Sequence, residues 1–235
     1  MGRFVNKLFF LFWRQGLAVW AVIYGMVLVS HASRRFKKLP KEIKDYLREL
    51  DRKCQKYGVK LILSGGKSVN FGNGRCGGYF DDASKILKVA IGGNEESILS
   101  VALHEESHLD QWKNPRSIWH DYKTYNGYNR FFHHINGGRI YKKKQAVQAA
   151  ISIEKECEQF TIKKIKAKWL GFINLDKYIA NSNCYLFSYL YMAETRKWPS
   201  KTPCDRKFRA HCHTKLLRSY RQIPENLRAA FDRYL

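Results

Sequence analysis

The sequence "SILSVALHEESHLDQW" spans residues 97 to 112 and is predicted to form a helix. Asn94 is placed to cap the start of this helix, and two glutamates follow in the first turn, where the helix dipole favours acids. His104 and His108 are four residues apart, so they share one helical face and can present two imidazoles to one metal ion. Glu105 lies about 100° round the helix from His104, where a general base can take a proton from a water molecule that the ion activates. An ordinary amphipathic helix that carries two histidines is the alternative interpretation.

The surroundings of this motif favour a zinc site. A strand is predicted directly before the helix, as the clefts of zinc peptidases require, and Val101 and Ala102 lie on the face that buries the helix. A catalytic zinc ion keeps three protein ligands and leaves one position for water. The metzincin class places a third histidine six residues after the second, but that position is Asn114 here. Zn2+ is therefore the predicted cofactor, and its third ligand must come from elsewhere in the chain.

Candidates for the third ligand lie in "ISIEKECEQF", residues 151 to 160. Glu154 and Glu158 share one face of the predicted helix, whereas Glu156 points elsewhere. His120, twelve residues after the second motif histidine, is a rival third ligand. SprT-like proteases also follow HExxH with a later histidine, but their His-Gly continuation is His-Asp in this chain. A further alternative is that Glu154 is a solvated charge on a lysine-rich helix.

The segment Glu154-x-x-Cys157-Glu158-x-Phe160 resembles the third-ligand helix of gluzincin-type peptidases. In those families the pattern is Glu-x-x-Ala, then Asp or Asn, before an apolar residue. The resemblance implies that Glu154 binds the metal and that Glu158 supports a ligand histidine without touching the ion. The chain departs from the pattern with Cys157 in place of Ala and Glu158 in place of Asp or Asn. The apolar helical surroundings of Cys157 predict a buried, reduced thiol.

Residues 40 to 235 are also similar to small, largely uncharacterised HExxH proteins of bacteriophages. The similar pieces are "ALHEESHLDQW", "IEKECEQF", "YIANSNCYLFSYLY", "RKW" and "SYRQIP". The metal motifs are specific to zincins as a group, and the other pieces suggest a lineage without indicating a substrate.

The rest of the chain is predicted to hold little sheet and much helix. Residues 113 to 140 are rich in Asn, Gly and Tyr and are predicted to be a loop. The order of a small sheet followed by helices predicts an α+β fold, a mostly helical minimal zincin-like domain over residues 39 to 235. The expected strands are 59 to 64 and a hairpin of 79 to 80 with 86 to 91, and the expected further helices are 40 to 58, 142 to 169, 175 to 195 and one after Pro224.

Residues 1 to 38 form a separate hydrophobic and basic segment. Leu8 to Ser30 is apolar apart from one arginine and one glutamine, and "RRFKK" follows shortly after it. The uninterrupted part is short for a membrane span, which needs roughly 20 apolar residues, and near the upper limit for the core of a signal peptide. We expect a cleaved signal or a membrane anchor, with a buried helix as a third possibility. The protein is then membrane-associated or exported, or else cytoplasmic in the host cell of a virus.

The net charge of +23 favours polyanionic partners such as nucleic acid or an anionic membrane surface. Lysine runs at residues 142 to 144 and 163 to 168, and tyrosines interleaved with basic residues at 122 to 131, are the sequence features that would bind them. Solvated helix faces and a loop that packs on the domain explain the same features.

Together the motifs predict a zinc-dependent peptidase with Glu105 as general base and a peptide or protein as substrate. The strand near Lys88 to Ile91 is expected to line the cleft and to hold an extended substrate at the sheet edge. Tyrosines and histidines after residue 118 are the candidates for stabilising the oxyanion. The alternative function is a non-catalytic basic protein that binds nucleic acid or a membrane surface and carries a structural metal.

Overall fold

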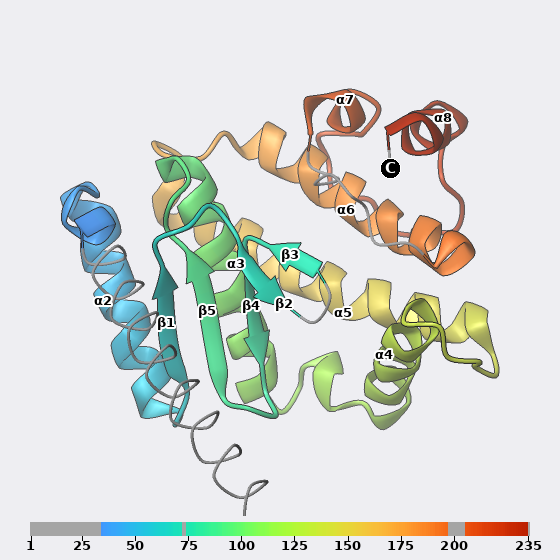
Figure 1. Ribbon diagram of the computed structural model, residues 1–235, viewed down its shortest axis with the longest axis horizontal. Helices are drawn as coiled ribbons and strands as arrows, with labels where there is room; N and C mark the ends of the chain where they lie inside the picture. Colours follow the sequence, from blue (N-terminus) through green and yellow to red (C-terminus); the bar gives the residue numbers. More distant parts are fainter. Residues whose placement is uncertain (1–33, 72–73, 197–204, 235) are drawn as a thin grey trace, which may run out of the picture.

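A small mixed sheet carries the helix with the HEESH motif. The computed structural model describes residues 34–71, 74–196 and 205–234. In it, β5 (Ile86–Ala90) pairs in parallel with β1 (Lys60–Ser64) and antiparallel with β4 (Gly78–Asp81). A separate two-stranded ladder joins β2 (Val69–Phe71) to β3 (Gly74–Cys76). The expected strand and hairpin are thus confirmed (Figure 1).

The expectation that residues 88 to 91 form a sheet edge is wrong. The strand order β1–β5–β4 places β5 in the centre, so its backbone hydrogen bonds are used on both sides. Among the described residues, β4 pairs with a strand on one side only. The two edge strands are thus β1, on which α2 (Lys41–Lys56) packs, and β4, which packs on α3 (Glu95–Lys113), so the edge near the motif helix that could pair with an extended peptide belongs to β4.

Two helices flank this sheet. α3 (Glu95–Lys113) packs on β4 and β5, and α2 (Lys41–Lys56) packs on β1 (Figure 1). The Asn94 side chain accepts a hydrogen bond from the backbone N–H of Ser97 at 2.8 Å, which confirms the predicted cap of α3. Ile98, Leu99 and Ala102 of α3 are buried in the core that α3 shares with the sheet and α2. Burial of this apolar face fixes how α3 is rotated and hence where its histidines point.

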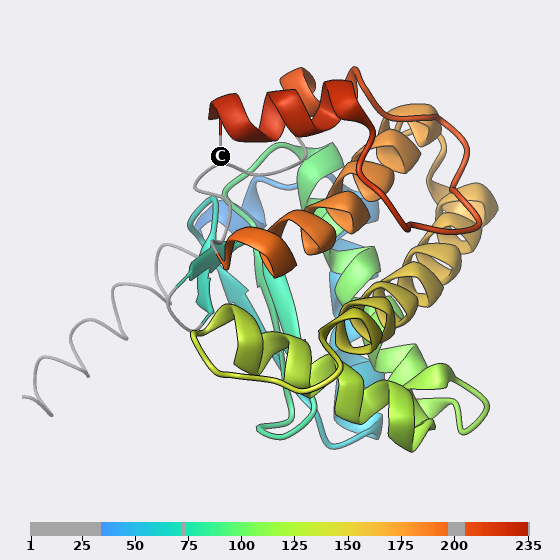
Figure 2. The ribbon, with the colours of Figure 1, turned by 90° about the vertical axis from the view of Figure 1, so that its right-hand side faces the viewer.

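The C-terminal half of the chain is helical, as predicted. α5 lies between α3 and α6, and α7 and α8 pack beyond α6 (Figures 1 and 2). The mostly helical α+β fold is thereby confirmed. The bounds of these elements are α5 (Lys143–Lys164), a π-helical continuation η2 (Ile165–Trp169), α6 (Leu175–Thr195), α7 (Arg206–Arg209) and α8 (Glu225–Tyr234).

The predicted loop at residues 113 to 140 is wrong over most of its length. It contains the short 3-10 helix η1 (Ile118–His120) and the helix α4 (Tyr122–Ile135), which Asp121 caps by accepting from the N–H of Thr124 at 2.7 Å. A Cβ at Gly127 would lie 2.5 Å from the Cβ of Ala149, so this glycine allows α4 to approach α5 closely. The glycine that suggested a loop is thus a packing residue within a helix.

The interior is divided into two hydrophobic cores. The first joins α2, the sheet, α3 and η2, and the second joins α4, α6, α7, α8 and the first half of α5. In the part of the chain that the structure describes, no helix is long and apolar enough to cross a membrane. The apolar segment Leu8 to Ser30 lies outside that part.

Candidate metal centre

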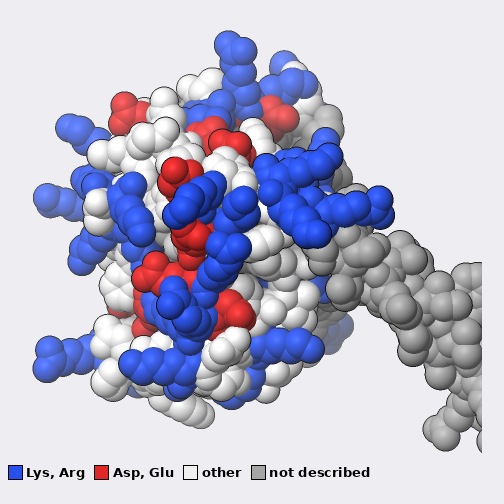
Figure 3. All heavy atoms as spheres, turned by 90° about the vertical axis from the view of Figure 1, so that its left-hand side faces the viewer, with Lys and Arg blue, Asp and Glu red and all other residues white. Residues whose placement is uncertain are grey.

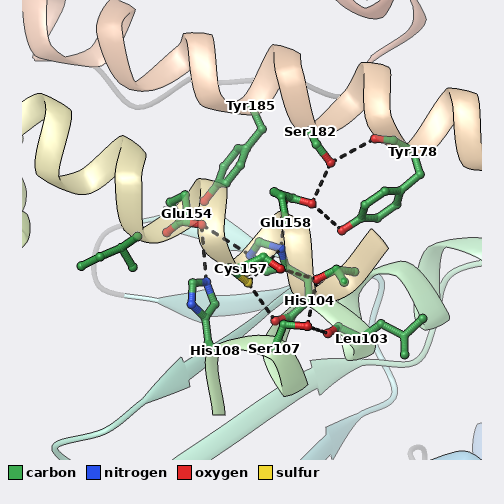
Figure 4. Close-up of polar contacts among 12 residues, drawn as sticks. Leu103, His104, Ser107, His108, Glu154, Cys157, Glu158, Tyr178, Ser182 and Tyr185 are labelled. Atoms are coloured by element: carbon green, nitrogen blue, oxygen red, sulfur yellow. Dashed lines mark hydrogen bonds and ion pairs between the residues drawn. The ribbon is translucent and has the colours of Figure 1, made fainter. Parts of the chain in front are cut away.

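The centre lies where α3 faces α5. α3 provides His104 and His108, and α5 provides Glu154 and Cys157 from successive turns (Figure 4). Glu105 follows His104 on α3. All except His104 are buried, and the exposed fraction of the His104 side chain is 15%. The two motif histidines and the predicted third ligand are therefore brought together by the fold.

The Nε2 atoms of both histidines face one carboxylate oxygen. Glu154 Oε2 lies 3.6 Å from His104 Nε2 and 3.4 Å from His108 Nε2. Donors about 2.0–2.1 Å from a tetrahedral zinc ion lie roughly 3.3–3.5 Å apart, so this spacing suits such an ion. Glu154 is 3% exposed, and its Oε2 atom has no hydrogen-bond partner. A buried carboxylate oxygen that accepts no hydrogen bond requires a cation beside it, and either the protonated rings or a bound metal ion would supply one.

Hydrogen bonds on the far side of His108 fix its tautomer. Its Nδ1 lies 2.9 Å from the Oε1 atom of Gln111, whose Nε2 donates to the backbone carbonyl of Ile153 and to Glu156. Because the Gln111 oxygen can only accept, His108 Nδ1 must carry the proton. Nε2 is therefore the ring nitrogen that faces Glu154, and it is the one that would bind a metal ion once it loses its proton.

His104 is held in the same way by Glu158. The Nδ1 of His104 lies 3.2 Å from Glu158 Oε1, and Glu158 Oε2 accepts from the hydroxyls of Tyr178 and Ser182, each at 2.7 Å (Figure 4). The carboxylate is 3% exposed and anchored from α6. Glu158 thus touches His104 and not the point on which the Nε2 atoms converge, as the resemblance to gluzincins implies.

The electrostatics of the centre favour bound cations. Burial alone would lower the pKa of His104, but Cys157, Glu158 and Glu154 raise it well above its usual value. The pKa of His108 is raised in the same sense against burial, by Cys157 and Glu154. Burial would raise the pKa of Glu154, yet the two histidines hold it far below its usual value. Without a metal ion the cluster therefore retains protons on its rings, and a metal ion would displace them.

Glu105 lies beside this cluster, next to the edge strand. It is 6% exposed, and its carboxylate accepts a hydrogen bond from the backbone N–H of Phe80 in β4. Burial raises its pKa, although His104 and His108 act in the opposite direction. A raised pKa brings a carboxylate closer to the working range of a general base. β4 can approach α3 this closely because residue 78 is a glycine. A Cβ at Gly78 would lie only 3.1 Å from Glu105 Cγ.

Several residues of the centre were not predicted from the sequence. Gln111 lies three residues after His108 on the same helical face, so its contact with that ring is predictable from local spacing. On α6, four hydroxyl side chains contact the carboxylates of α5 or each other. Tyr189 donates to Glu154 Oε1 at 2.9 Å, and the hydroxyl of Tyr185 lies 3.0 Å from that of Tyr189. The four are Tyr178, Ser182, Tyr185 and Tyr189, spaced as one stripe of a helix.

The structure does not bring His120 into the centre. Its side chain is exposed, and its Nε2 lies 2.9 Å from the backbone carbonyl oxygen of Trp112. Glu156 also lies outside the cluster, where it accepts hydrogen bonds from Gln111 and Ser117. The thiol of Cys157 is buried and reduced, as predicted.

No family model, curated protein or solved structure matches the chain. The site must therefore be interpreted from its own donors. Two imidazole nitrogens, one carboxylate oxygen and a nearby thiol could hold a metal ion, and this donor set suits zinc.

Proposed function

We propose that the chain is a zinc-dependent peptidase, with the ion held by His104, His108 and Glu154. The observation that carries the proposal is the buried Glu154 Oε2 atom, which has no hydrogen bond and lies 3.6 and 3.4 Å from two imidazole Nε2 atoms. Both rings are oriented by acceptors at Nδ1, which is how proteins prepare metal ligands.

Glu105 would act as the general base. A zinc ion in this centre supplies Lewis acidity, which acidifies water and polarises the scissile carbonyl. Glu105 accepts the proton of the attacking water and passes it to the nitrogen of the leaving amine, so that one water is consumed for each peptide bond broken. Its neighbour Phe80 keeps the carboxylate at the wall of the site through a backbone N–H. A purely structural metal site would have no use for this carboxylate.

β4 supplies the surface for an extended substrate. It is antiparallel to β5 and lies against α3 at Glu105, so a peptide added to its free edge would pass the centre. This replaces β5, which has no free edge. On the α6 side, the partly exposed Tyr185 is the best-placed hydroxyl for the oxyanion, because its ring lies 6.2 Å from that of His104 while Tyr189 is committed to Glu154.

The proposal is tested by metal analysis and hydrolysis on the full-length chain. We expect one zinc ion per chain, weakened in Glu154→Gln, and hydrolysis of unstructured protein substrates that is lost in Glu105→Gln with the zinc retained. Glu49→Gln is the matched control, because Glu49 is an exposed glutamate on α2. Absence of zinc in protein purified without chelators would refute the proposal.

A second candidate function rests on exposed basic side chains. Lysines and arginines cover the face that carries α2, with acidic side chains between them (Figure 3). Some of these charges are neutralised locally, since Asp45 binds both Lys41 and Arg48. At the start of α5, the N-cap residue Lys142 and the helical Lys143 and Lys144 are exposed, whereas Lys164 at its end binds Glu106 and Asp110.

We propose that the exposed lysines, such as Lys142–Lys144, bind a nucleic acid or an anionic membrane surface. In this function the metal centre would catalyse no reaction. Of the aromatic residues interleaved with basic ones, Tyr122 is 79% exposed while Phe131 is fully buried, so most of that segment packs on the domain. Binding to single-stranded DNA or anionic vesicles that weakens steeply with salt would support this function, and binding insensitive to salt would contradict it.

A further inference from the structure

Cys157 is a third soft donor beside the two histidines. It lies one helical turn after Glu154 on α5 and is fully buried. Donor atoms of His104, His108 and Cys157 all lie within 4.8 Å of one another. The Sγ atom is 3.7 Å from His104 Nδ1, the ring nitrogen that also faces Glu158, and the thiol donates to the His104 carbonyl oxygen at 3.3 Å. Cys157 also acts on the charge of His108, so the sulfur is close to both rings. Figure 4 shows the sulfur between the two helices, directed toward the histidines.

An independent observation indicates that a ligand belongs at this point. The Glu154 Oε2 atom is buried, accepts no hydrogen bond and faces the Nε2 atoms of the same two rings, where the metal ion would lie. Coordination by Cys157 therefore requires its side chain to turn from the Nδ1 side of His104 toward that point. The cluster therefore offers two nitrogens, one oxygen and one sulfur from two facing helices. The contact that holds the sulfur is a weak thiol donation to a carbonyl, which a bond to a metal ion easily outweighs.

We propose that Cys157 is a fourth ligand of the metal centre, through its thiolate. Binding replaces the S–H bond by a sulfur–metal bond and releases the proton to solvent. The proposal rests on the zinc centre proposed above and adds that the resting centre is closed, so that water or substrate must displace the thiolate before hydrolysis. A closed centre of four protein ligands also favours thiophilic ions over ions that prefer oxygen.

Cobalt substitution of the full-length protein tests this ligand without relying on activity. We expect one Co2+ per chain with a sulfur-to-cobalt charge-transfer band in the near ultraviolet. The band should be present in Cys54→Ala, a control at a fully buried cysteine of α2, and absent in Cys157→Ala and Cys157→Ser. Stoichiometric cobalt without the band in the native chain would overturn the thiolate ligand and leave the three-ligand centre standing. No cobalt binding would overturn both proposals.

X-ray absorption of the native zinc protein gives the same answer without any variant. One scatterer at about 2.3 Å is expected for sulfur, and a shell of nitrogen and oxygen alone at about 2.0–2.1 Å would refute the proposal. Metal selectivity provides a further readout. We expect Cys157→Ser to raise the Kd for Cd2+ by roughly 100-fold or more, which exceeds the effect of losing a residue that only orients a ligand. The Kd for Mn2+ should change far less. Equal changes for both ions would contradict a direct sulfur bond.

Discussion

Replacing Glu154 by glutamine perturbs the proposed centre most directly. The amide preserves the size of the side chain but removes the negative charge that faces His104 and His108. The Tyr189 hydroxyl can still donate to the remaining amide oxygen, so the packing between α5 and α6 is retained. The substitution therefore separates metal binding from folding better than alanine would.

The expected loss follows from the linkage between binding and stability. Zinc at 100 times its Kd stabilises the folded protein by about 2.7 kcal/mol. Removing a residue that only orients a ligand weakens metal binding roughly 10–100-fold, so about 100-fold is a lower bound for losing the ligand itself. The same zinc concentration then stabilises the variant by about 0.4 kcal/mol. For a chain of this length, the difference of about 2.3 kcal/mol corresponds to a zinc-induced rise in Tm that is smaller by roughly 5–9 °C.

Thermal unfolding with and without added zinc measures this difference. The native chain and Glu49→Gln should show the full zinc-induced rise, and Glu154→Gln should lose most of it. Comparison of the rise within each variant cancels any effect of the substitution on the metal-free protein. An equal rise in Glu154→Gln and the native chain would refute Glu154 as a ligand, and no rise in the native chain would refute the centre as a whole.

Three further predictions concern the base, the edge strand and pH. Glu105→Gln should retain zinc by elemental analysis while peptide hydrolysis falls by roughly 10²–10⁴-fold; loss of zinc together with activity would instead assign Glu105 a role in the fold. In Gly78→Ala the new Cβ would lie 2.6 Å from the backbone oxygen of Lys88 in β5 and 2.7 Å from the Val101 side chain, so urea denaturation should show a loss of roughly 1–3 kcal/mol, and an unchanged midpoint would contradict tight packing of β4 against β5 and α3. Without metal, the raised pKa values of His104 and His108 contribute stability that is complete below about pH 6.5 and is lost as the pH rises through those values. Because zinc binds the neutral rings, the zinc-induced rise in Tm should be larger at about pH 8 than at about pH 5.5, and the opposite trend would refute proton competition at these ligands.

Local signals in the sequence were sufficient for most of the helices. The bounds of α6 (Leu175–Thr195) are those expected from the sequence, and α3 begins after the predicted Asn94 cap. These features depend on residues within a turn of each other. The order of the strands depends on a parallel pairing between segments far apart, which the sequence pattern does not encode, and β5 was therefore placed at the edge. α4 was missed because Gly127 and the neighbouring asparagines have low helix propensity, which close packing against α5 overrides.

The candidate site divides in the same way. The spacing of His104 and His108 puts both rings on one face of α3 whatever surrounds it, so this pair was predictable. The choice of Glu154 as third ligand depends on the resemblance to gluzincins. Spacing alone could not select it, because the contact between α3 and α5 is formed only in the tertiary structure. The four hydroxyl residues of α6 lie at helical spacing in the sequence. Their role becomes apparent only once α6 is known to face α5. Gln111 lies one turn from His108, so its contact with that ring depends on local spacing alone.

The position of the centre between the two hydrophobic cores explains why so many polar side chains are buried there. α3 belongs to the first core, α6 to the second, and α5 contributes to both. Polar contacts join these helices: Gln111 binds the carbonyl of Ile153 between α3 and α5, and Glu158 binds Tyr178 between α5 and α6. A seam built for stability alone would be packed with apolar residues, because buried charges add stability only when every polar atom is paired. Here one carboxylate oxygen of Glu154 is left without a hydrogen bond at the point where two imidazoles converge. The contacts of this oxygen with the two imidazoles at 3.6 and 3.4 Å favour a bound cation over a purely structural role for the polar seam.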